Sequence, residues 1–252
     1  MLNIDLSGKT AVITGGTGQL GREMVRTLAA AGANIAIHYR QNVTKAQELL
    51  QEIEQPGVCG LAVQAEITEF ESVLAMRDKI HASLGKVDIV VSSAVIKYPW
   101  RNVLDQSPED YESQFRSNVL HNVFMAKAFV PAMIQQRWGR MISINTECAM
   151  QCYPNQSAYV SGKRGMDGVL RVLAKEVGEH NVTVNQVAPG WMISEDRPES
   201  SASEQYRQGV PMKHRGHAQE IANLVAFLAS DLAGFITGAY IPVCGGNIMP
   251  AI

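Results

Sequence analysis

The chain has 252 residues, of which 46% are hydrophobic and 18% are charged, and its formal net charge is −2. This composition is typical of a globular protein, and the weak charge argues against a nucleic-acid partner or an anionic membrane surface. No apolar run approaches the ~20 residues of a membrane span, and the first residues lack the pattern of a signal peptide, so we expect a cytoplasmic protein.

Short β-branched segments alternate with helical patterns along the sequence. We predict strands over Thr10–Thr14, Asn34–Tyr39, Gly60–Gln64, Val87–Ser92, Met141–Asn145, Thr183–Val187 and Tyr240–Val243. We predict helices over Gln19–Ala31, Thr44–Glu54, Glu69–Leu84, Tyr111–Arg137, Ser157–Glu179 and Ala218–Ser230. This alternation is typical of βαβ crossovers, and the uniformly apolar strands indicate a buried parallel sheet. Residues 1–252 are therefore predicted to form a single doubly wound α/β domain with about seven strands and helices on both faces.

Two features stand outside this alternation. Residues 194–208 are rich in Ser, Glu, Asp, Arg and Pro, which is typical of a surface loop or of a mobile lid over a site; we place the lid at about 194–212. The four cysteines, at positions 59, 148, 152 and 244, form no Cys-x-x-Cys pair and stand in apolar segments. We expect them to be buried, reduced thiols, and we predict no metal site.

A glycine-rich turn follows the first strand and opens the first helix, with glycines at Gly15, Gly18 and Gly21. Glycines let a backbone turn tightly beside a phosphate, and a helix N-terminus offers free N–H groups and a positive dipole end. A glycine-rich turn alone is a weak signal. The strand before it and the helix after it are the context that a dinucleotide site needs.

The end of the second strand bears on the choice of dinucleotide. Arg40 stands there, and no Asp or Glu lies between residues 37 and 47. NAD-preferring sites usually carry an acid at this point for the ribose 2′-hydroxyl, whereas a guanidinium suits a 2′-phosphate. Arg40 therefore favours NADP(H) over NAD(H); the alternative is a solvated arginine that begins a loop.

Tyr159 and Lys163 lie four residues apart in a predicted helix, so their side chains rise from one face. A free phenol titrates near ~10, and a neighbouring cation lowers that pKa. A pKa near ~7 requires about 4 kcal/mol, which the lysine together with a bound cationic cofactor can supply. The pair then acts as a general acid or base toward a carbonyl or alcohol. Without further context, the same spacing usually marks an exposed helix face.

The ordered set of motifs resembles the short-chain dehydrogenase/reductase family over nearly the whole chain, most of all the 3-oxoacyl-[acyl-carrier-protein] reductases. The motifs are the glycine turn, Asp88–Ala94, Asn118-Val119, Ser143–Thr146, Tyr159 with Lys163, Val187–Gly190, Phe227–Asp231, Ile236–Gly238 and Gly245-Gly246. The resemblance implies a Rossmann fold and NADPH-dependent reduction of a ketone, of 3-oxoacyl or related type, to a secondary alcohol. A sugar or polyol dehydrogenase and a non-catalytic dinucleotide-binding protein are the alternatives.

The resemblance also implies roles for single residues. Tyr159 would protonate the carbonyl oxygen, Lys163 would lower the pKa of Tyr159 and bind the nicotinamide ribose, and Asn118 would hold a water relay. Thr146 stands where the family has a catalytic serine, thirteen residues before the tyrosine. Its hydroxyl can still bond the carbonyl, but its methyl narrows the site, so we expect activity with an altered substrate range. The implied cofactor contacts are Gly15, Thr17, Gly18, Gln19, Leu20, Gly21, Tyr39, Arg40, Glu66 (to the adenine amino group), Ile67, Ser93, Ala94, Tyr159, Lys163, Pro189, Gly190 and Ser194 (to the carboxamide).

The chain departs from the family pattern in three places. Gln19 replaces a usual glycine, Cys244 replaces an acid before the last Gly-Gly, and Ser92–Val95 replaces the Asn-Asn-Ala-Gly that follows the fourth strand. We expect the lost asparagines to cost some stability of the central sheet, and we expect the changes to affect cofactor affinity and turnover more than the fold.

The substrate pocket is expected after the fourth, fifth and sixth strands. Its candidate residues, which would equally suit packing at a subunit interface, are Ile96, Tyr98, Trp100, Gln151, Tyr153, Trp191 and Met192. Arg137 matches a basic position that binds acyl-carrier protein in the reductases, whereas His180 replaces a common arginine. A thioester and a free small-molecule carbonyl are thus both open as substrates. Family members are usually tetramers, so we expect a homotetramer, or a dimer, built on the helices at 111–137 and 157–179.

Overall fold

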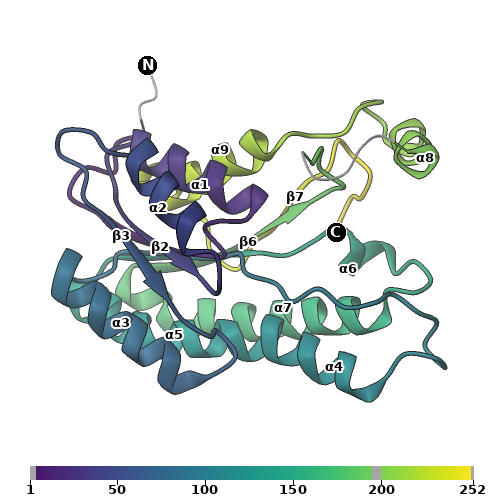
Figure 1. Ribbon diagram of the computed structural model, residues 1–252, viewed down its shortest axis with the longest axis horizontal. Coiled ribbons are helices and arrows are strands. Elements are labelled where there is room, and N and C mark those ends of the chain that lie inside the picture. Colours follow the sequence, from purple (N-terminus) through teal and green to yellow (C-terminus); the bar gives the residue numbers. More distant parts are fainter. Residues whose placement is uncertain (1–3, 195–199, 251–252) are drawn as a thin grey trace.

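The computed structural model describes residues 4–194 and 200–250 and contains one seven-stranded sheet (Figure 1). The strands are β1 Thr10–Thr14, β2 Asn34–Tyr39, β3 Gly60–Gln64, β4 Ile89–Ser92, β5 Gly139–Ile144, β6 Val182–Pro189 and β7 Tyr240–Val243. Their order across the sheet is β3-β2-β1-β4-β5-β6-β7, and every neighbouring pair is parallel. The order reverses between β1 and β4, so that a crevice forms at the carboxyl ends of these two strands.

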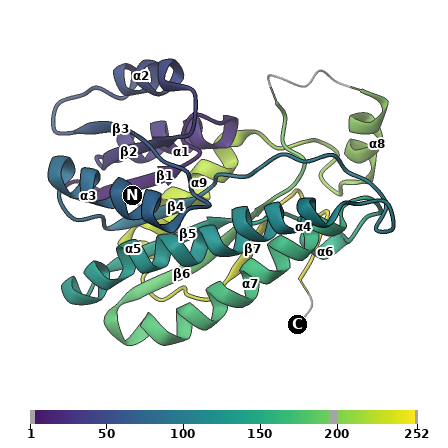
Figure 2. The same ribbon diagram turned by 60° about the horizontal axis from the view of Figure 1, so that its bottom comes forward.

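Helices cover both faces of the sheet, as predicted (Figures 1 and 2). The helices are α1 Gln19–Ala30, α2 Val43–Glu52, α3 Phe70–Leu84, α4 Pro108–Gln114, the π-helical η1 Phe115–Leu120, α5 His121–Gln136, α6 Cys148–Gln151, α7 Ser157–Val177, the 3-10 turns η2 Gly178–His180 and η3 Asp231–Ala233, α8 Ser201–Gly209 and α9 Ala218–Ala229. Helices α1, α2 and α9 lie over one face, and α3, α5 and α7 lie over the other.

Alternate residues of each strand build two separate apolar cores. In β4, Ile89 and Val91 pack with α1 and α9, whereas Val90 packs with α3, α5 and α7. This is the period-two alternation of a strand, and it explains why strands with a core on each side read as unbroken apolar runs. The fold class predicted from the sequence is confirmed, and most predicted bounds lie within two residues of the observed ones.

The long predicted helix Tyr111–Arg137 differs from the observed structure. It begins earlier, because Ser107 caps the helix and Pro108 suits its first turn, and it contains the π-helical segment η1. There the side-chain amide of Asn118 donates to the carbonyl of Gln114 at 2.9 Å, and that of Asn122 donates to the carbonyl of Asn118 at 2.7 Å. These amides occupy carbonyls that α-helical N–H groups would use, which accompanies the wider turn.

Two helices were not predicted. Helix α6 has only four residues, too few for a periodic pattern. Helix α8 lies in the segment interpreted as a loop or lid, and Ser200 caps it in a box with Ser203. Its sequence, SASEQYRQG, has few apolar residues, and Ser203 is the residue that is buried, so no apolar stripe marks this segment as a helix. Residues 195–199 of the predicted lid lie outside the described residues.

The prediction of buried cysteines was wrong for three of the four. All four are free, but Cys59 and Cys152 are exposed, Cys148 is half-buried and only Cys244 is buried. An apolar sequence around a cysteine does not determine whether its side chain is buried when the cysteine lies at or beyond the end of a helix or strand. Within residues 4–194 and 200–250, no helix is long and apolar enough to cross a membrane.

Candidate active site

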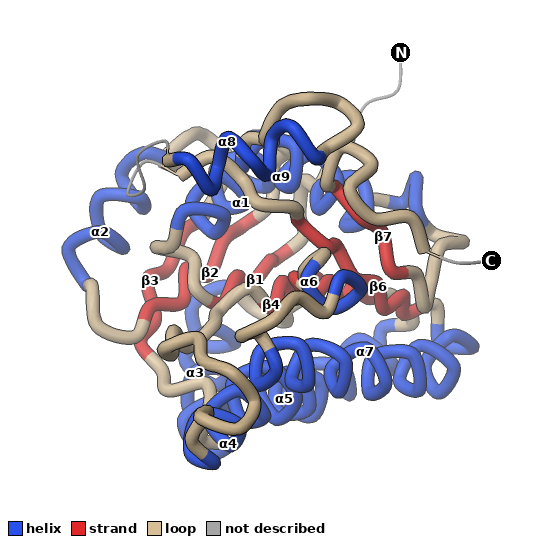
Figure 3. Tube along the Cα trace, turned by 90° about the vertical axis from the view of Figure 1, so that its right-hand side faces the viewer, coloured by secondary structure: helices blue, strands red, loops and turns tan. Residues whose placement is uncertain are grey.

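The predicted site residues gather at the carboxyl ends of the strands, where open parallel sheets bind ligands. Figure 3 looks at the molecule from the side that carries α6 and α8, and shows α6 in front of the strands. The loops after β1, β4, β5 and β6 carry Gly15, Ser93, Thr146 and Gly190 respectively. Motifs that are far apart in the sequence thus lie together at one edge of the sheet.

The glycine turn has the geometry of a phosphate cradle. Gly15 has φ +65°, and a Cβ there would lie 2.9 Å from Cα of Ala94; a Cβ on Gly21 would lie 2.1 Å from the carbonyl oxygen of Gly15. Gly18 caps α1 without a side-chain hydrogen bond, and no acidic residue stands in the first turn. The first N–H groups of α1 are therefore available to an anion, and the described residues fit a dinucleotide phosphate.

His38, which was not among the predicted site residues, holds this turn from its place in β2. Its Nδ1 accepts the backbone N–H of Gly15 at 3.0 Å, and its Nε2 lies 3.1 Å from the carbonyl oxygen of Ala65. The bond to Gly15 requires an unprotonated Nδ1, which assigns the proton to Nε2. Burial lowers the pKa of His38, in keeping with this neutral form. A histidine next to the last residue of a mostly apolar strand was the sequence signal for this role.

Arg40 and Glu66 lie together at the ends of β2 and β3, where the adenosine end of a dinucleotide is expected. Arg40 is 52% exposed, and its guanidinium lies 4.0 Å from the Glu66 carboxylate. Glu66 Oε1 accepts the backbone N–H and the hydroxyl of Thr68 at 3.1 and 2.8 Å. Tyr39 is half-buried and Ile67 is buried beside them. Arg40 is thus a solvent-facing cation whose only ion pair among the described residues is long.

Thr14 secures the loop after β4, where the family's asparagines are replaced. Its hydroxyl accepts the backbone N–H groups of Ser93 and Ala94 at 2.9 and 3.2 Å. The Gln19 side chain donates to the carbonyl of Ile193, which ties α1 to the segment after β6. Thr17 and Leu20 are half-buried in the turn, and Ser194 is half-buried at the end of that segment. Pro189 ends β6, and Gly190 follows it.

Tyr159, Lys163 and Thr146 form one group. Thr146 lies close enough to the Tyr159 hydroxyl to lower its pKa, and Lys163 Nζ lies 5.7 Å from the centre of the Tyr159 ring. Lys163 is buried and donates to the carbonyl of Ile144 at 2.6 Å. A short loop after β5 and the first two turns of α7 bring the three together.

The pKa values of this group differ from the expectation. Burial raises the pKa of Tyr159 above that of a free phenol, and the hydrogen bond from Thr146 opposes it only in part. Burial also lowers the pKa of Lys163 to about 7. The residues of the chain alone do not lower the pKa of the Tyr159 phenol, because near neutral pH the buried Lys163 side chain is protonated in only part of the molecules. The predicted lowering thus depends on a charge that the chain does not contain.

Asn118 lies beside this group in the π-helical turn. It is 1% exposed, and its Oδ1 has no hydrogen-bond partner among the described residues. Its Nδ2 lies 3.0 Å from where a Cβ on Gly162 would stand, so the absence of a side chain at Gly162 lets α7 approach η1 closely. A buried acceptor without a partner is a natural place for an ordered water, which suits the relay expected at Asn118.

Of the predicted pocket residues, Tyr98 and Trp100 lie on Tyr159. The Tyr98 hydroxyl accepts the backbone N–H of Tyr159 at 2.8 Å, and the Trp100 ring stacks on the Tyr159 ring with centres 6.4 Å apart. Ile96 is half-buried and accepts a bond from Gln114 at 2.9 Å. Tyr153 is exposed, and Gln151 is half-buried.

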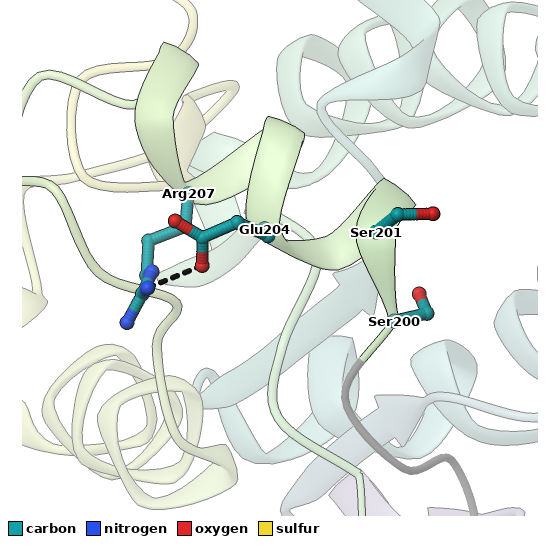
Figure 4. Close-up of a pocket in the computed structure, with 4 residues that line it drawn as sticks. All are labelled: Ser200, Ser201, Glu204 and Arg207. Carbon is teal, nitrogen blue, oxygen red and sulfur yellow. Dashed lines mark hydrogen bonds and ion pairs between the residues drawn. The ribbon is translucent and has the colours of Figure 1, made fainter.

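Trp191 and Met192 line a cavity of about 400 Å³ instead. Its walls come from the segment after β6, from α8 and from the loop after β7, including Gly190, Tyr206, Gly245 and Ile248. A second hollow lies on the outer side of α8 and is lined by Ser200, Ser201, Glu204 and Arg207, the last two forming an ion pair (Figure 4). None of the predicted site residues lines that outer hollow.

Known proteins share both the sequence and this architecture. The family model described as enoyl-(acyl carrier protein) reductase matches residues 17–247. The 3-oxoacyl-[acyl-carrier-protein] reductase FabG of Escherichia coli is 36% identical over 251 residues, which is 98% of this chain and 100% of the relative. The FabG of Staphylococcus aureus (strain N315) is 34% identical over 245 residues, 96% of this chain and 98% of the relative.

Two solved structures bear on the cofactor. A blue fluorescent protein from a metagenomic library, solved in complex with NADPH, superposes with a TM-score of 0.91 at 30% identity and covers 97% of this chain and 100% of its own. An NAD+-bound xylitol dehydrogenase superposes with a TM-score of 0.89 at 25% identity and covers 96% and 99%.

Proposed function

Because the chain belongs to the short-chain dehydrogenase/reductase family of oxidoreductases, we propose that it reduces a ketone to a secondary alcohol with NADPH, and that Tyr159 is the proton donor. The observation that carries the proposal is the placement of Tyr159 beside Thr146 and the buried Lys163, at the same carboxyl ends of the strands as the glycine turn. The names of the relatives support a 3-oxoacyl-type ketone.

The residues of the chain have distinct tasks in this reaction. Tyr159 gives its hydroxyl proton to the carbonyl oxygen, and the Thr146 hydroxyl holds that oxygen in place. When bound, a reduced nicotinamide supplies the hydride that the carbonyl carbon receives. Lys163, as an ammonium, stabilises the phenolate that Tyr159 becomes. The unpaired Oδ1 of Asn118 orients the water through which a proton returns to this group.

Arg40 supports NADPH as the preferred cofactor. Its guanidinium is exposed beside the ends of β2 and β3 and can pair with a 2′-phosphate in a bidentate way. Glu66 lies on the same side and would repel a phosphate placed between them, so the two residues oppose each other in part. One structural neighbour was solved with NADPH and another with NAD+, so the experiment below uses both cofactors.

A second candidate function is the oxidation of a sugar or polyol. The structural neighbour that is a xylitol dehydrogenase supports it. So does Arg137, whose guanidinium donates to the carbonyl of Glu179 at 3.0 Å and is thus partly occupied rather than free for a carrier protein. The oxidative reaction would use the same pair with the proton moving in the opposite direction, from the alcohol to Tyr159.

The test is turnover of NADPH and NADH with β-keto thioesters, diketones and keto sugars, and of NADP+ and NAD+ with polyols. We expect NADPH consumption with at least one ketone, and much slower polyol oxidation. If cofactor binds but no substrate of either panel is turned over, the protein is a non-catalytic dinucleotide-binding member of the family and the proposal fails.

We also propose that the protein is a homo-oligomer, a tetramer or a dimer. Phe115 in η1 and Val172 in α7 are 50% and 56% exposed on the helices expected to form the interface. Such exposed apolar side chains on long helices suit burial against a second copy. Light scattering coupled to size exclusion measures the mass, and a monomer at micromolar concentration would contradict the assignment.

A further inference from the structure

Glu147 follows Thr146 directly and is a buried carboxylic acid, 3% exposed. Its backbone N–H donates to the carbonyl of Pro189 at 3.0 Å, which fixes the loop after β5 against the end of β6. Burial raises the pKa of Glu147. No cation forms an ion pair with it among the described residues. Ionising a buried carboxyl that has no neighbouring cation costs several kcal/mol of folding free energy unless hydrogen-bond donors surround it. A structural role of Glu147 should therefore be visible in the contacts that its side chain makes.

Two further segments meet at this carboxyl. Asn247 Nδ2, in the loop after β7, donates to Oε2 at 3.0 Å. The Tyr206 hydroxyl of α8 lies within reach of the same side chain, and it accepts the backbone N–H of Trp191 at 2.9 Å. A carboxyl group has two oxygens, so it can contact both side chains at once. The acid therefore joins α8, the loop after β7 and the segment after β6 at a point one residue from Thr146.

Tyr206 attaches α8 to this region. The helix buries only Ser203 among its nine residues, so apolar packing contributes little to holding it. The Tyr206 hydroxyl instead accepts the backbone N–H of Trp191 at 2.9 Å, and the two rings meet edge to face with centres 5.5 Å apart. A Cβ on Gly190 would lie 2.6 Å from that hydroxyl, so only glycine admits Tyr206 at this position.

The segments joined by Glu147 are also the walls of the 400 Å³ cavity. Tyr206 lines it from α8, Gly245 and Ile248 line it from the loop after β7, and Gly190 and Met192 line it from the segment after β6. Gly190 is the expected neighbour of the nicotinamide. Glu147 thus stands behind the site and holds the far walls, while Thr146 and Tyr159 face the reacting atoms.

We propose that Glu147 is a positioning residue: through Tyr206 and Asn247 it holds α8 and the loop after β7 against the carbonyl site. This rests on the proposed function only in calling the site a carbonyl site, since the attachment itself is a property of the fold. Detachment of α8 exposes the carboxyl to water, where it ionises more readily than in the closed protein. Opening therefore releases a proton and becomes easier as the pH rises above the ordinary carboxyl pKa.

The other titratable groups that face Glu147 do not change this sign. The charge of Glu147 affects three of these groups, namely Tyr206 on α8, Tyr240 on β7 and Cys148 on α6. Burial raises the pKa of all three. They stay neutral at the pH values where a carboxyl group with a raised pKa ionises, so Glu147 is the group in this cluster that makes opening depend on pH.

Amide hydrogen exchange of the full-length protein tests the attachment without any need for turnover. We expect Tyr206→Phe, which keeps the ring and removes the hydroxyl, to speed exchange in residues 201–209 about tenfold, as loss of one hydrogen bond implies. Glu147→Gln should do the same and should also abolish the rise of that exchange, corrected for its intrinsic pH dependence, between pH 5 and 8. The double variant should exchange no faster than the faster single variant, because both remove one interaction.

Gln205→Ala is the matched control, since Gln205 is an exposed residue of the same helix, and its exchange should equal that of the unmodified protein. If Tyr206→Phe leaves exchange in α8 unchanged, the inference is overturned whatever the activity. Where ketone turnover is found, Tyr206→Phe should raise KM several-fold with kcat within twofold. Absence of turnover with faster exchange would leave the attachment intact and reject only the proposed reaction.

Discussion

His38 Nδ1 accepts the backbone N–H of Gly15 at 3.0 Å, and so the second strand of the sheet holds the turn that precedes α1. The carbonyl of His38 accepts the N–H of Gly16 at 3.0 Å, so that one residue satisfies two successive donors of the turn. The glycine turn, where we propose that the phosphates bind, is therefore held by β2 as well as by the conformation of its own glycines, and its geometry depends on one neutral imidazole.

This arrangement makes stability depend on the protonation of His38. Its pKa is lowered in the folded protein, so the unfolded chain binds a proton first as the pH falls below about 6.5. The stabilisation is present above that pH and is lost below it. His121, whose pKa burial lowers to about 3, adds to the same trend. Glu147, whose pKa burial raises, contributes the opposite sign, but the two histidines outnumber it, so we expect the free energy of unfolding, measured with urea, to fall from pH 7 to pH 5.

His38→Asn should reduce this slope, because an amide oxygen can take the place of Nδ1 but does not titrate. Equal slopes in the His38 variant and the unmodified protein would show that His38 does not titrate in this range.

Lys163 leads to a prediction about proton uptake. Burial lowers its pKa to about 7, so at pH 8 most of the free protein carries a neutral lysine. Its expected role beside the nicotinamide ribose needs the ammonium, so binding of cofactor at pH 8 should take up close to one proton. Calorimetric titrations in two buffers of different ionisation enthalpy measure this number. Lys163→Met should remove the uptake, and a value near zero in the unmodified protein would contradict the assigned role.

The sequence predicted those parts of the fold that repeat. Strands such as Asn34–Tyr39 are apolar at every position because both faces are buried, and their alternation with helices identifies the parallel sheet. The glycine turn was predictable because its conformation permits few other residues, as the positive φ of Gly15 shows. Tyr159 and Lys163 were found by spacing, since one helical turn places them together.

What the sequence did not predict depends on contacts between distant segments. Nothing near Glu147 in the chain indicates that its donors come from residues 206 and 247, and His38 gains its role only when β2 lies beside the turn. Helix α8 has no apolar stripe to reveal it. The raised pKa of Tyr159 likewise follows from burial in the assembled crevice, which a count of neighbouring charges in the sequence does not include.

Arg40 should decide the cofactor preference. Arg40→Ala removes the exposed guanidinium and should weaken NADPH binding at least tenfold while NADH binding changes less than twofold, because only NADPH carries a 2′-phosphate. Glu66→Gln should act in the opposite direction and strengthen NADPH binding, since it removes the opposing carboxylate. Fluorescence titrations with both cofactors measure the four affinities. Equal losses for NADPH and NADH in the Arg40 variant would reject the 2′-phosphate contact.

Tyr159→Phe separates chemistry from binding. The change removes the hydroxyl and keeps the ring that stacks on Trp100, so the crevice should keep its shape. We expect kcat to fall at least about a thousandfold, in the range of a lost general acid, with cofactor affinity within a few-fold. Tyr98→Phe is a useful control, because the hydrogen bond that the Tyr98 hydroxyl makes within the described part of the chain goes to the backbone of Tyr159, so its loss should affect kcat far less. Comparable activity in the Tyr159 variant would reject it as the proton donor.

Thr146 allows the hydroxyl and the methyl to be tested apart. Its Oγ1 accepts the N–H of Cys148 at 3.2 Å and lies beside the Tyr159 hydroxyl, so the Thr146 hydroxyl has both a structural and a chemical neighbour. Thr146→Ser keeps the hydroxyl and should hold kcat within a few-fold, while KM for bulkier ketones falls because the methyl no longer narrows the site. Thr146→Val keeps the shape and should lower kcat/KM about a hundredfold, as loss of one donor to a developing oxyanion does. Steady-state kinetics on a small and a branched ketone distinguish the two effects. If the valine variant is as active as the serine variant, the carbonyl is held by another group, and the hydroxyl of Thr146 serves only to cap the turn at Cys148.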